Sequence, residues 1–248
     1  MTTLRIIGLS VAIAGSAAIA AATVGSDRSG AESPHNACIA EVRVAVLRRA
    51  GPRNPGCWSV GPLSLGMTHE QIQAQLGPAD AEGDLRSTSA TGRAYHAAAY
   101  LLHGGPGLRV LQLTLAGDQL VRMTNNSPTI SSGDCAVRLS PDTTEPDRDF
   151  PAYAKFDGIA VGDSAGVLPA KLGRLGLLNT SADRVSYWPT PLAFDIDPGR
   201  SDIVGFTVAT NADALDAGAV VQLRAAQTPR GCTLRIVGLA DAVPPAAH

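Results

Sequence analysis

A serine lies in the sequence Gly162-Asp163-Ser164-Ala165-Gly166, which fits the G-x-S-x-G pattern of hydrolases whose serine is the nucleophile. In that hydrolase order a histidine base follows the serine, and the only later histidine is His248, the final residue. A chain end is a poor place for a fixed hydrogen bond. We therefore expect Ser164 to cap a helix and expect no enzyme. A secreted serine hydrolase that uses Ser164 is the alternative.

Histidines and paired aspartates could hold a metal ion. His96 and His103 are seven residues apart in a strand-like stretch, so they should lie on opposite faces of the strand. His69 falls at the first position of a predicted helix, where solvent should surround it. Asp195 and Asp197 share a strand face and could bind calcium, but a Pro-Gly pair follows at once, which is typical of a solvated strand end. We expect no metal and no other cofactor.

The overall composition excludes several classes of function. Lys and Arg total 20 against 22 Asp and Glu, so the net charge of −2 gives no electrostatic basis for binding nucleic acid. The sequence contains no phosphate-binding loop or dinucleotide motif, so nucleotide use is not expected. With 248 residues, of which 45% are hydrophobic and 17% charged, the chain is long enough to bury a core.

The beginning of the chain predicts export. Arg5 is followed by an uncharged, mostly apolar run from Ile6 to Val24, and Ala20 and Ala22 supply the small residues of a cleavage site. We expect a signal peptide at residues 1–22 and a periplasmic or secreted protein. An uncleaved anchor in the inner membrane is the alternative, because the run approaches the roughly 20 residues that cross a bilayer. Only then would the protein contact a membrane.

Four cysteines fit an exported protein, because oxidising compartments favour disulfides. They are Cys38, Cys57, Cys135 and Cys232. Three connectivities are possible. The pairs 38–57 and 135–232 are favoured, since a helix and a Gly/Pro turn can return the chain from the first cysteine to the second, and the last two cysteines occupy similar sequence settings.

An internal repeat divides the chain. PLSLGMTHEQIQAQLG, ending at Gly77, matches GIAVGDSAGVLPAKLG, ending at Gly173. Gly66 and Gly162 are 96 residues apart, as are Gly77 and Gly173. LRVLQLT at 108–114 matches VGFTVAT at 204–210 at the same spacing. These matches predict two tandem modules.

The predicted organisation follows from the repeat and from the Asp-, Thr- and Pro-rich segment between its copies. It comprises a signal peptide (1–22), an N-terminal segment with one helix (23–57), a first module (58–140), a linker (141–153), a second module (154–239) and a tail (240–248). The expected fold class is α+β, in which each module packs short helices on one face of an antiparallel meander sheet. The other face of the sheet is left to solvent or to a partner.

Helix signals open each module. Thr68 and Gln71 can form a capping box, and Gly77 followed by proline ends the helix. In the second copy Ser164 takes the place of Thr68, and Pro169 falls inside the helix, which should therefore be short, bent or irregular. Strands are then expected at 93–102, 108–115, 120–123, 185–188, 192–197, 203–210, 220–224 and 233–239.

The helix start, the Leu-Gly-Pro stop and the meander together resemble the BamE-like (SmpA/OmlA) lipoproteins of outer-membrane assembly. The tandem arrangement is similar to that of the β-lactamase-inhibitor proteins. The matching residues are Leu65, Gly66, Met67, Thr68, Gln71, Leu76, Gly77 and Pro78, with Val161, Gly162, Leu172 and Gly173 in the second copy. The resemblance implies protein binding without catalysis. Because aromatic residues are only 4% of the chain, inhibition of a β-lactamase is not expected.

Aromatic residues in the strand-rich regions are the candidate binding residues. They are Tyr95, Tyr187, Trp188 and Phe194. Such rings contribute strongly to protein interfaces when they are exposed, and the alternative is that they complete the core. The sequence therefore predicts a non-catalytic protein that binds another envelope or extracellular protein.

Overall fold

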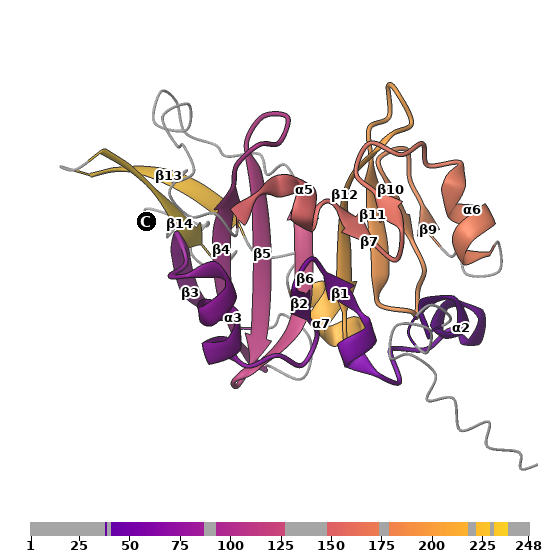
Figure 1. Cartoon of the computed structure of the whole chain (residues 1–248), viewed down its shortest axis with the longest axis horizontal. Coiled ribbons are helices and arrows are strands. Elements are labelled where there is room, and N and C mark those ends of the chain that lie inside the picture. Colours follow the sequence, from indigo (N-terminus) through magenta and orange to yellow (C-terminus); the bar gives the residue numbers. More distant parts are fainter. Residues whose placement is uncertain are drawn as a thin grey trace, which may run out of the picture. The chain divides into compact units, whose positions relative to one another are not determined.

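The structure is a computed structural model that describes residues 38, 41–86, 93–126, 148–173, 179–217, 222–228 and 231–237 (Figure 1). The predicted signal peptide, residues 1–22, and the predicted tail, residues 240–248, lie outside these ranges. No helix within the described ranges is both long enough and apolar enough to span a membrane.

The described elements fall in two runs along the chain. The first run contains α2 (Glu41–Arg48), η1 (Pro55–Cys57), β1 (Ser59–Val60), β2 (Leu63–Ser64), α3 (His69–Leu76), β3 (Ala81–Arg86), β4 (Ala94–Leu102), β5 (Arg109–Ala116) and β6 (Gln119–Asn126). The second run contains α5 (Phe150–Tyr153), β7 (Lys155–Phe156), β8 (Ile159–Ala160), α6 (Val167–Leu172), β9 (Asn179–Thr180), β10 (Arg184–Ser186), β11 (Leu192–Ile196), β12 (Ile203–Ala209), α7 (Ala212–Ala217), β13 (Gln222–Thr228) and β14 (Gly231–Val237).

Eight strands form one antiparallel sheet in the order β3-β4-β5-β6-β12-β11-β10-β9. β6 pairs with β12 in its centre, where Asn125 faces Phe206 and Arg122 faces Ala209. Separate two-stranded sheets are formed by β1 with β2, by β7 with β8 and by β13 with β14. The predicted α+β class and the antiparallel sheet are therefore confirmed.

Two segments 96 residues apart share their local backbone geometry. In the first hairpin Ser59 pairs with Ser64, and in the second Lys155 pairs with Ala160. Three further backbone hydrogen bonds of the first segment recur 96 residues later. Leu65 N–Trp58 O corresponds to Val161 N–Ala154 O, and Met67 N–Ser64 O corresponds to Asp163 N–Ala160 O. At the helix ends, Gly77 N–Gln73 O corresponds to Gly173 N–Pro169 O. The sequence similarity thus coincides with equal hydrogen bonding around the two helices.

The strands that follow α3 and α6 do not correspond in the way that the sequence repeat predicts. Gly66 N donates to Leu120 O of β6 at 2.8 Å, and Gly162 N donates to Ile203 O of β12 at 2.7 Å. Gly66 thus bonds to the last of the four sheet strands in the first run, and Gly162 to the last of the four in the second. The predicted match of residues 108–114 with 204–210 pairs β5 with β12 instead, and these hydrogen bonds do not support it. β9 and β10, the first strands after α6, are shorter than β3 and β4, the first strands after α3. The fourth strand therefore follows α6 after fewer residues than the fourth strand follows α3.

The two helices end alike but begin differently. Thr68 and Gln71 form the predicted capping box at the start of α3, with Gln71 N donating to the threonine hydroxyl at 3.3 Å. α6 is shorter, as predicted, and begins at Val167 with Gly166 as an N-cap that makes no side-chain bond. Pro169 is tolerated because it lies in the first turn, where the backbone N–H groups have no partner within the helix.

The main core lies between one face of the sheet and the hairpins and helices. Its largest fully buried side chains include Trp58, Tyr100, Tyr153, Tyr187, Phe156, Phe194 and Phe206. The ring of Trp58, just before β1, and the ring of Phe156, in β7, lie 5.6 Å apart between centroids. Phe156 also lies 6.1 Å from Phe206 of β12, which ties the second hairpin to the sheet.

The buried side chain of Arg148 donates a hydrogen bond to the C-terminal end of α3. It is 3% exposed, and its Nε donates to Leu76 O at 2.8 Å while its Nη1 contacts Asp80 at 2.9 Å. The guanidinium also donates to Pro78 O and lies over the Tyr100 ring. The end of the predicted linker is therefore packed against the first run of elements.

The second face of the sheet is covered more than expected. Side chains of the β13–β14 hairpin, including Ile236, pack on β3 and β4, and α7 packs on Ala209. Polar side chains at the middle of this face, among them Gln112, Thr114 and Thr207, are also buried. The expectation that this face is left to solvent or to a partner is therefore wrong where the β13–β14 hairpin and α7 pack on it, because β13 and β14 were expected within the second module's sheet and α7 was not predicted.

Candidate functional site

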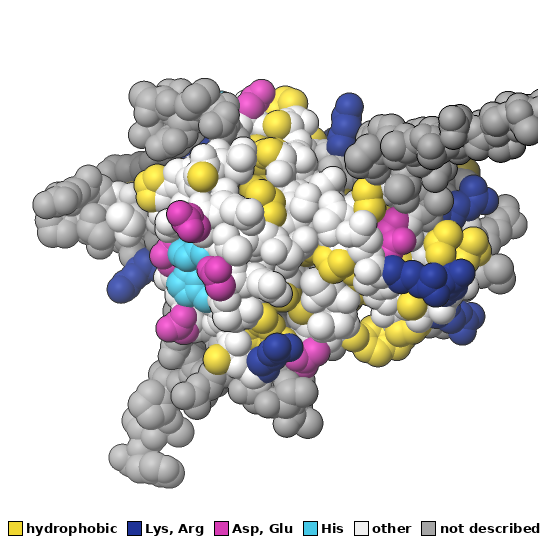
Figure 2. All heavy atoms as spheres, turned by 60° about the horizontal axis from the view of Figure 1, so that its bottom comes forward, with side chains coloured by type: hydrophobic (Ala, Val, Ile, Leu, Met, Phe, Trp, Pro, Cys, Tyr) yellow, Lys and Arg dark blue, Asp and Glu magenta, His cyan; other side chains and the backbone are white. Residues whose placement is uncertain are grey.

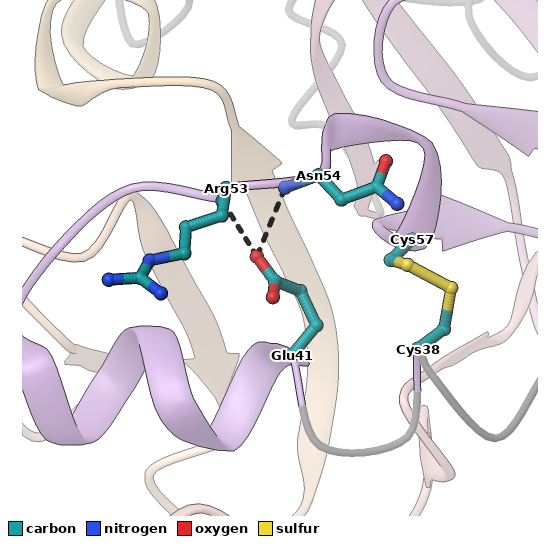
Figure 3. Close-up of a disulfide and its surroundings, with 5 residues drawn as sticks. All are labelled: Cys38, Glu41, Arg53, Asn54 and Cys57. Carbon is teal, nitrogen blue, oxygen red and sulfur yellow. Dashed lines mark hydrogen bonds between the residues drawn. A yellow bond between two sulfur atoms is a disulfide. The ribbon is translucent and has the colours of Figure 1, made fainter.

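Helix α2 is held firmly on the rest of the protein. The predicted disulfide between Cys38 and Cys57 is confirmed and joins the start of the α2 region to η1 (Figure 3). One carboxylate oxygen of Glu41 accepts hydrogen bonds from the backbone N–H groups of Arg53 at 2.6 Å and Asn54 at 3.2 Å. The helix also buries three apolar side chains, Val42, Ala45 and Val46. Cys232 is disulfide-bonded as well, and its favoured partner Cys135 lies outside the described residues.

The outward side of α2 carries cations and an exposed leucine. Arg43 and Arg48 are exposed, and Leu47 is 48% exposed. Trp188, which is 45% exposed, lies in the turn between β10 and β11, and Thr190 of that turn donates from its hydroxyl to Ala45 O of α2 at 3.1 Å. Figure 2 shows Lys and Arg side chains gathered beside hydrophobic ones at its right. We call Arg43, Leu47, Arg48 and Trp188 the α2 surface.

Three of the four candidate aromatic residues lie inside the protein. Tyr187 and Phe194 are fully buried, with their rings edge to face at 6.3 Å. Tyr95 is 3% exposed and donates its hydroxyl to Asp213 of α7 at 2.7 Å. The prediction that these three form an exposed contact face is wrong, because both faces of the sheet are packed at these positions. Trp188 keeps the exposure that the prediction required.

Ser164 lies in a loop immediately before α6. Its side chain is exposed, and its hydroxyl accepts a hydrogen bond from Gly166 N at 3.4 Å. The prediction that it caps the helix is wrong, since α6 begins later, at Val167. Among the described residues no hydrogen bond joins Ser164 to a histidine, and His248 lies outside those residues.

The two aspartates of the 192–197 strand are not brought together. Asp195 accepts from Arg184 Nη1 at 3.0 Å, and burial raises its pKa while Arg184 opposes that rise. A register irregularity follows Asp195, and β11 ends before Asp197. Hydrogen bonds from the Gly199 and Arg200 backbone and from the Arg200 side chain lower the pKa of Asp197. Asp197 therefore closes a turn at the strand end.

A histidine–carboxylate cluster, which the sequence did not indicate, forms where α3 crosses β3 and β4. His69 Nε2 lies 3.5 Å from Glu82 Oε1, and His96 Nε2 lies 3.8 Å from Glu82 Oε2. His96 Nδ1 lies 3.0 Å from Asp84 Oδ1. Figure 2 shows histidine side chains flanked by acidic ones at its left. We call His69, Glu82, Asp84 and His96 the histidine cluster.

The cluster depends on a strand that the sequence analysis did not predict. β3 pairs with β4 so that Asp84 faces His96, and Glu82 lies two residues earlier on the same side of the sheet. His69 is not simply surrounded by solvent, because the helix start places it over these residues. His103 lies elsewhere, beyond the end of β4, with Asp149 at 3.6 Å. The alternation of Glu82 and Asp84 was the signal that could have revealed the site.

A pocket of about 490 Å³ lies beside the disulfide. Its lining includes Gly61 of the turn between β1 and β2 and, from the second hairpin, Lys155, Asp157 and Gly158. Gly61 and Asp157, at equivalent places in the two turns, both have positive φ, at 60° and 48°. Desolvation raises the pKa of Asp157 to about 6, against the attraction of Lys171.

No protein-family model matches the chain, and no match is found among curated proteins or among solved structures.

Proposed function

We propose that the chain is an exported protein, periplasmic or secreted, that acts by binding another envelope or extracellular protein and does not catalyse a reaction. The observation that carries this proposal is the α2 surface. It consists of Leu47, Arg43 and Arg48 on one anchored helix, together with Trp188 in the turn whose Thr190 bonds to that helix, and Leu47 and Trp188 are both about half exposed. Trp and Arg are the residue types that most often dominate the energy of protein interfaces.

The anchoring of α2 favours binding. The disulfide, the two backbone hydrogen bonds to Glu41 and the bond from Thr190 hold the helix before any partner arrives. A surface that is already ordered loses less conformational entropy on association. The arginines favour a partner whose contact surface is acidic, because complementary charge guides the encounter and sets the orientation.

The two runs of elements support a second part of the proposal, that the chain contains two tandem modules. Each run has a hairpin, a short helix and four strands of the sheet, in the mirrored order β3-β4-β5-β6 and β12-β11-β10-β9. This is the architecture that the resemblance to the BamE-like and β-lactamase-inhibitor families implies. Those families bind proteins, so the same role is proposed here.

Export rests on the predicted signal peptide and on the disulfide between Cys38 and Cys57. Disulfides persist mainly in oxidising compartments such as the bacterial periplasm and the extracellular space. In the proposal, the mature protein begins after residue 22.

Site-specific crosslinking tests the binding role. A photoreactive phenylalanine analogue is placed at Leu47 or at Trp188 in the exported protein, and cells are irradiated. We expect a discrete adduct with one protein from both positions. Charge reversal in Arg43→Glu/Arg48→Glu should reduce its yield at least tenfold, because the partner surface is acidic.

The matched control is the same analogue at Gln75, an exposed residue of α3 away from the α2 surface. Gln75 should give no such adduct. Equal adducts from all three positions, or an adduct that survives the charge reversal, would contradict a specific role for the α2 surface.

A further inference from the structure

We propose that His69, Glu82 and His96 bind one zinc-type divalent metal ion, with Asp84 positioning His96. The three ligands come from α3, β3 and β4, and their nearest ligand atoms all lie within 4.8 Å of one another. Zn²⁺ accepts imidazole nitrogen and carboxylate oxygen at about 2.0–2.2 Å, and sites with three protein ligands leave the fourth position to water. Histidine and carboxylate ligands together favour zinc over calcium or magnesium, which prefer oxygen alone.

The separations are close to those of a tetrahedral site. Metal–ligand distances of about 2.0–2.2 Å place neighbouring ligand atoms about 3.3 Å apart. One carboxylate oxygen of Glu82 lies 3.5 Å from His69 Nε2, and the other lies 3.8 Å from His96 Nε2. Small rotations of these half-exposed side chains would close the remaining gap, because the exposed fractions of 30% for both histidines and 38% for Glu82 leave room for movement.

Asp84 prepares His96 to be a ligand. A carboxylate accepts hydrogen bonds, so the 3.0 Å contact places the proton of His96 on Nδ1 and leaves the lone pair on Nε2. That nitrogen is buried from solvent and has no hydrogen-bond partner among the residues that the structure describes. A carboxylate behind the second ring nitrogen is the arrangement that orients ligand histidines in zinc sites.

His69 is also held in place, with a lone pair on Nε2 that a metal ion would take over from the Gln73 amide. Its backbone N–H donates to the carbonyl oxygen of Asp118 at 3.1 Å and to a carboxylate oxygen of Asp118 at 3.2 Å. The amide of Gln73 lies 3.3 Å from His69 Nε2, and when it donates, that nitrogen also carries a lone pair. The β3–β4 pairing fixes the backbones of Glu82 and His96. The two carboxylates of the cluster balance the charge of a divalent ion.

Metal titration of purified, untagged protein tests the site. After treatment with a chelator, the protein is titrated with Zn²⁺ by calorimetry and with Co²⁺ by visible absorption. We expect one ion per chain, a visible Co²⁺ spectrum and a rise in melting temperature with Zn²⁺. His69→Ala and His96→Ala should weaken binding at least 100-fold, and Asp84→Asn about tenfold, as for other residues that position a ligand.

The matched control is His103→Ala, which removes a histidine that also faces a carboxylate but lies outside the cluster. Its affinity should equal that of the wild type. If His96→Ala does not fold, His69→Ala in the partly exposed first turn of α3 and Asp84→Asn carry the test. Failure of the wild type to bind Zn²⁺, or an equal loss in His103→Ala and His69→Ala, would overturn the proposal.

Discussion

The hairpin and helix of residues 59–76 and those of residues 155–172 keep the same backbone hydrogen bonds but secure their helices by different side chains. In the first, a complete capping box starts α3 and the buried Arg148 closes its end. In the second, α6 begins without a side-chain cap, and Lys171 reaches back to Gly158 O across the surface. Backbone hydrogen bonding thus persists where side-chain capping does not.

This difference indicates what stabilises each helix. α3 is fixed at both ends by side-chain hydrogen bonds, from the capping box at its start and from Arg148, which is distant in sequence, at its end. α6 depends on its buried side chains, Leu168 and Leu172, and on the hydrogen bonds that join the segment before it to β12. Substitutions at corresponding places should therefore have unequal effects in the two segments.

The largest difference is expected between Arg148 and Lys171. Arg148→Met should lower the free energy of unfolding by about 3 kcal/mol, because it removes the cation from the buried ion pair with Asp80 and the donor to two carbonyl groups. Lys171→Met should cost less than about 1 kcal/mol, since the lysine is exposed and makes one backbone contact. Urea denaturation of both variants measures the two losses. Similar losses would show that the two helix ends are equally secured.

A smaller difference is expected at the helix starts. Thr68→Ala should lower the free energy of unfolding by about 1 kcal/mol, because the capping box is lost. Ser164→Ala should change it by less than about 0.5 kcal/mol, since its hydroxyl lies outside the helix and makes one long bond. Thermal and urea unfolding compare the pair. A loss in Ser164→Ala as large as that in Thr68→Ala would remove the contrast.

The smallest effect is expected at Asp157, the counterpart of Gly61, and it depends on pH. Its pKa is raised to about 6, so the folded protein holds this proton more tightly than the unfolded chain does. Protonation therefore stabilises the fold, and this gain is lost as the pH rises from about 4 through 6. Asp157→Asn should flatten that part of the stability curve and stabilise the protein slightly at pH 7. Melting temperatures between pH 4 and pH 8 provide the measurement, and parallel curves for wild type and variant would contradict the pKa.

Much of the fold could be predicted from local signals. The capping box at Thr68, the stop at Gly77, the shortened second helix and the long strands all follow from short-range chemistry. The strand match between the two halves could not be predicted, because neighbouring strands of a meander have similar alternating patterns. Backbone hydrogen bonds distinguish them, such as those from Gly66 to β6 and from Gly162 to β12.

The candidate sites were less accessible to sequence reasoning. Tyr187 is buried, whereas the adjacent Trp188 is exposed. Which of two neighbouring residues faces the core depends on what packs there, and the sequence does not give that. The histidine cluster contains residues of α3, β3 and β4. The register of β3 against β4 brings their residues together, and β3 was not predicted. Spacing along the chain suggested a comparison of His96 with His103, whereas the fold places His96 beside His69.

The central pairing of β6 with β12 has a consequence for the growing chain. Because Asn125 finds its partner only when Phe206 has been made, the inner edge of β6 stays open while the second run is synthesised as far as β12. An open strand edge can pair with another chain and aggregate. The nascent protein is therefore most exposed to aggregation along the strand that ends up in the middle of its sheet.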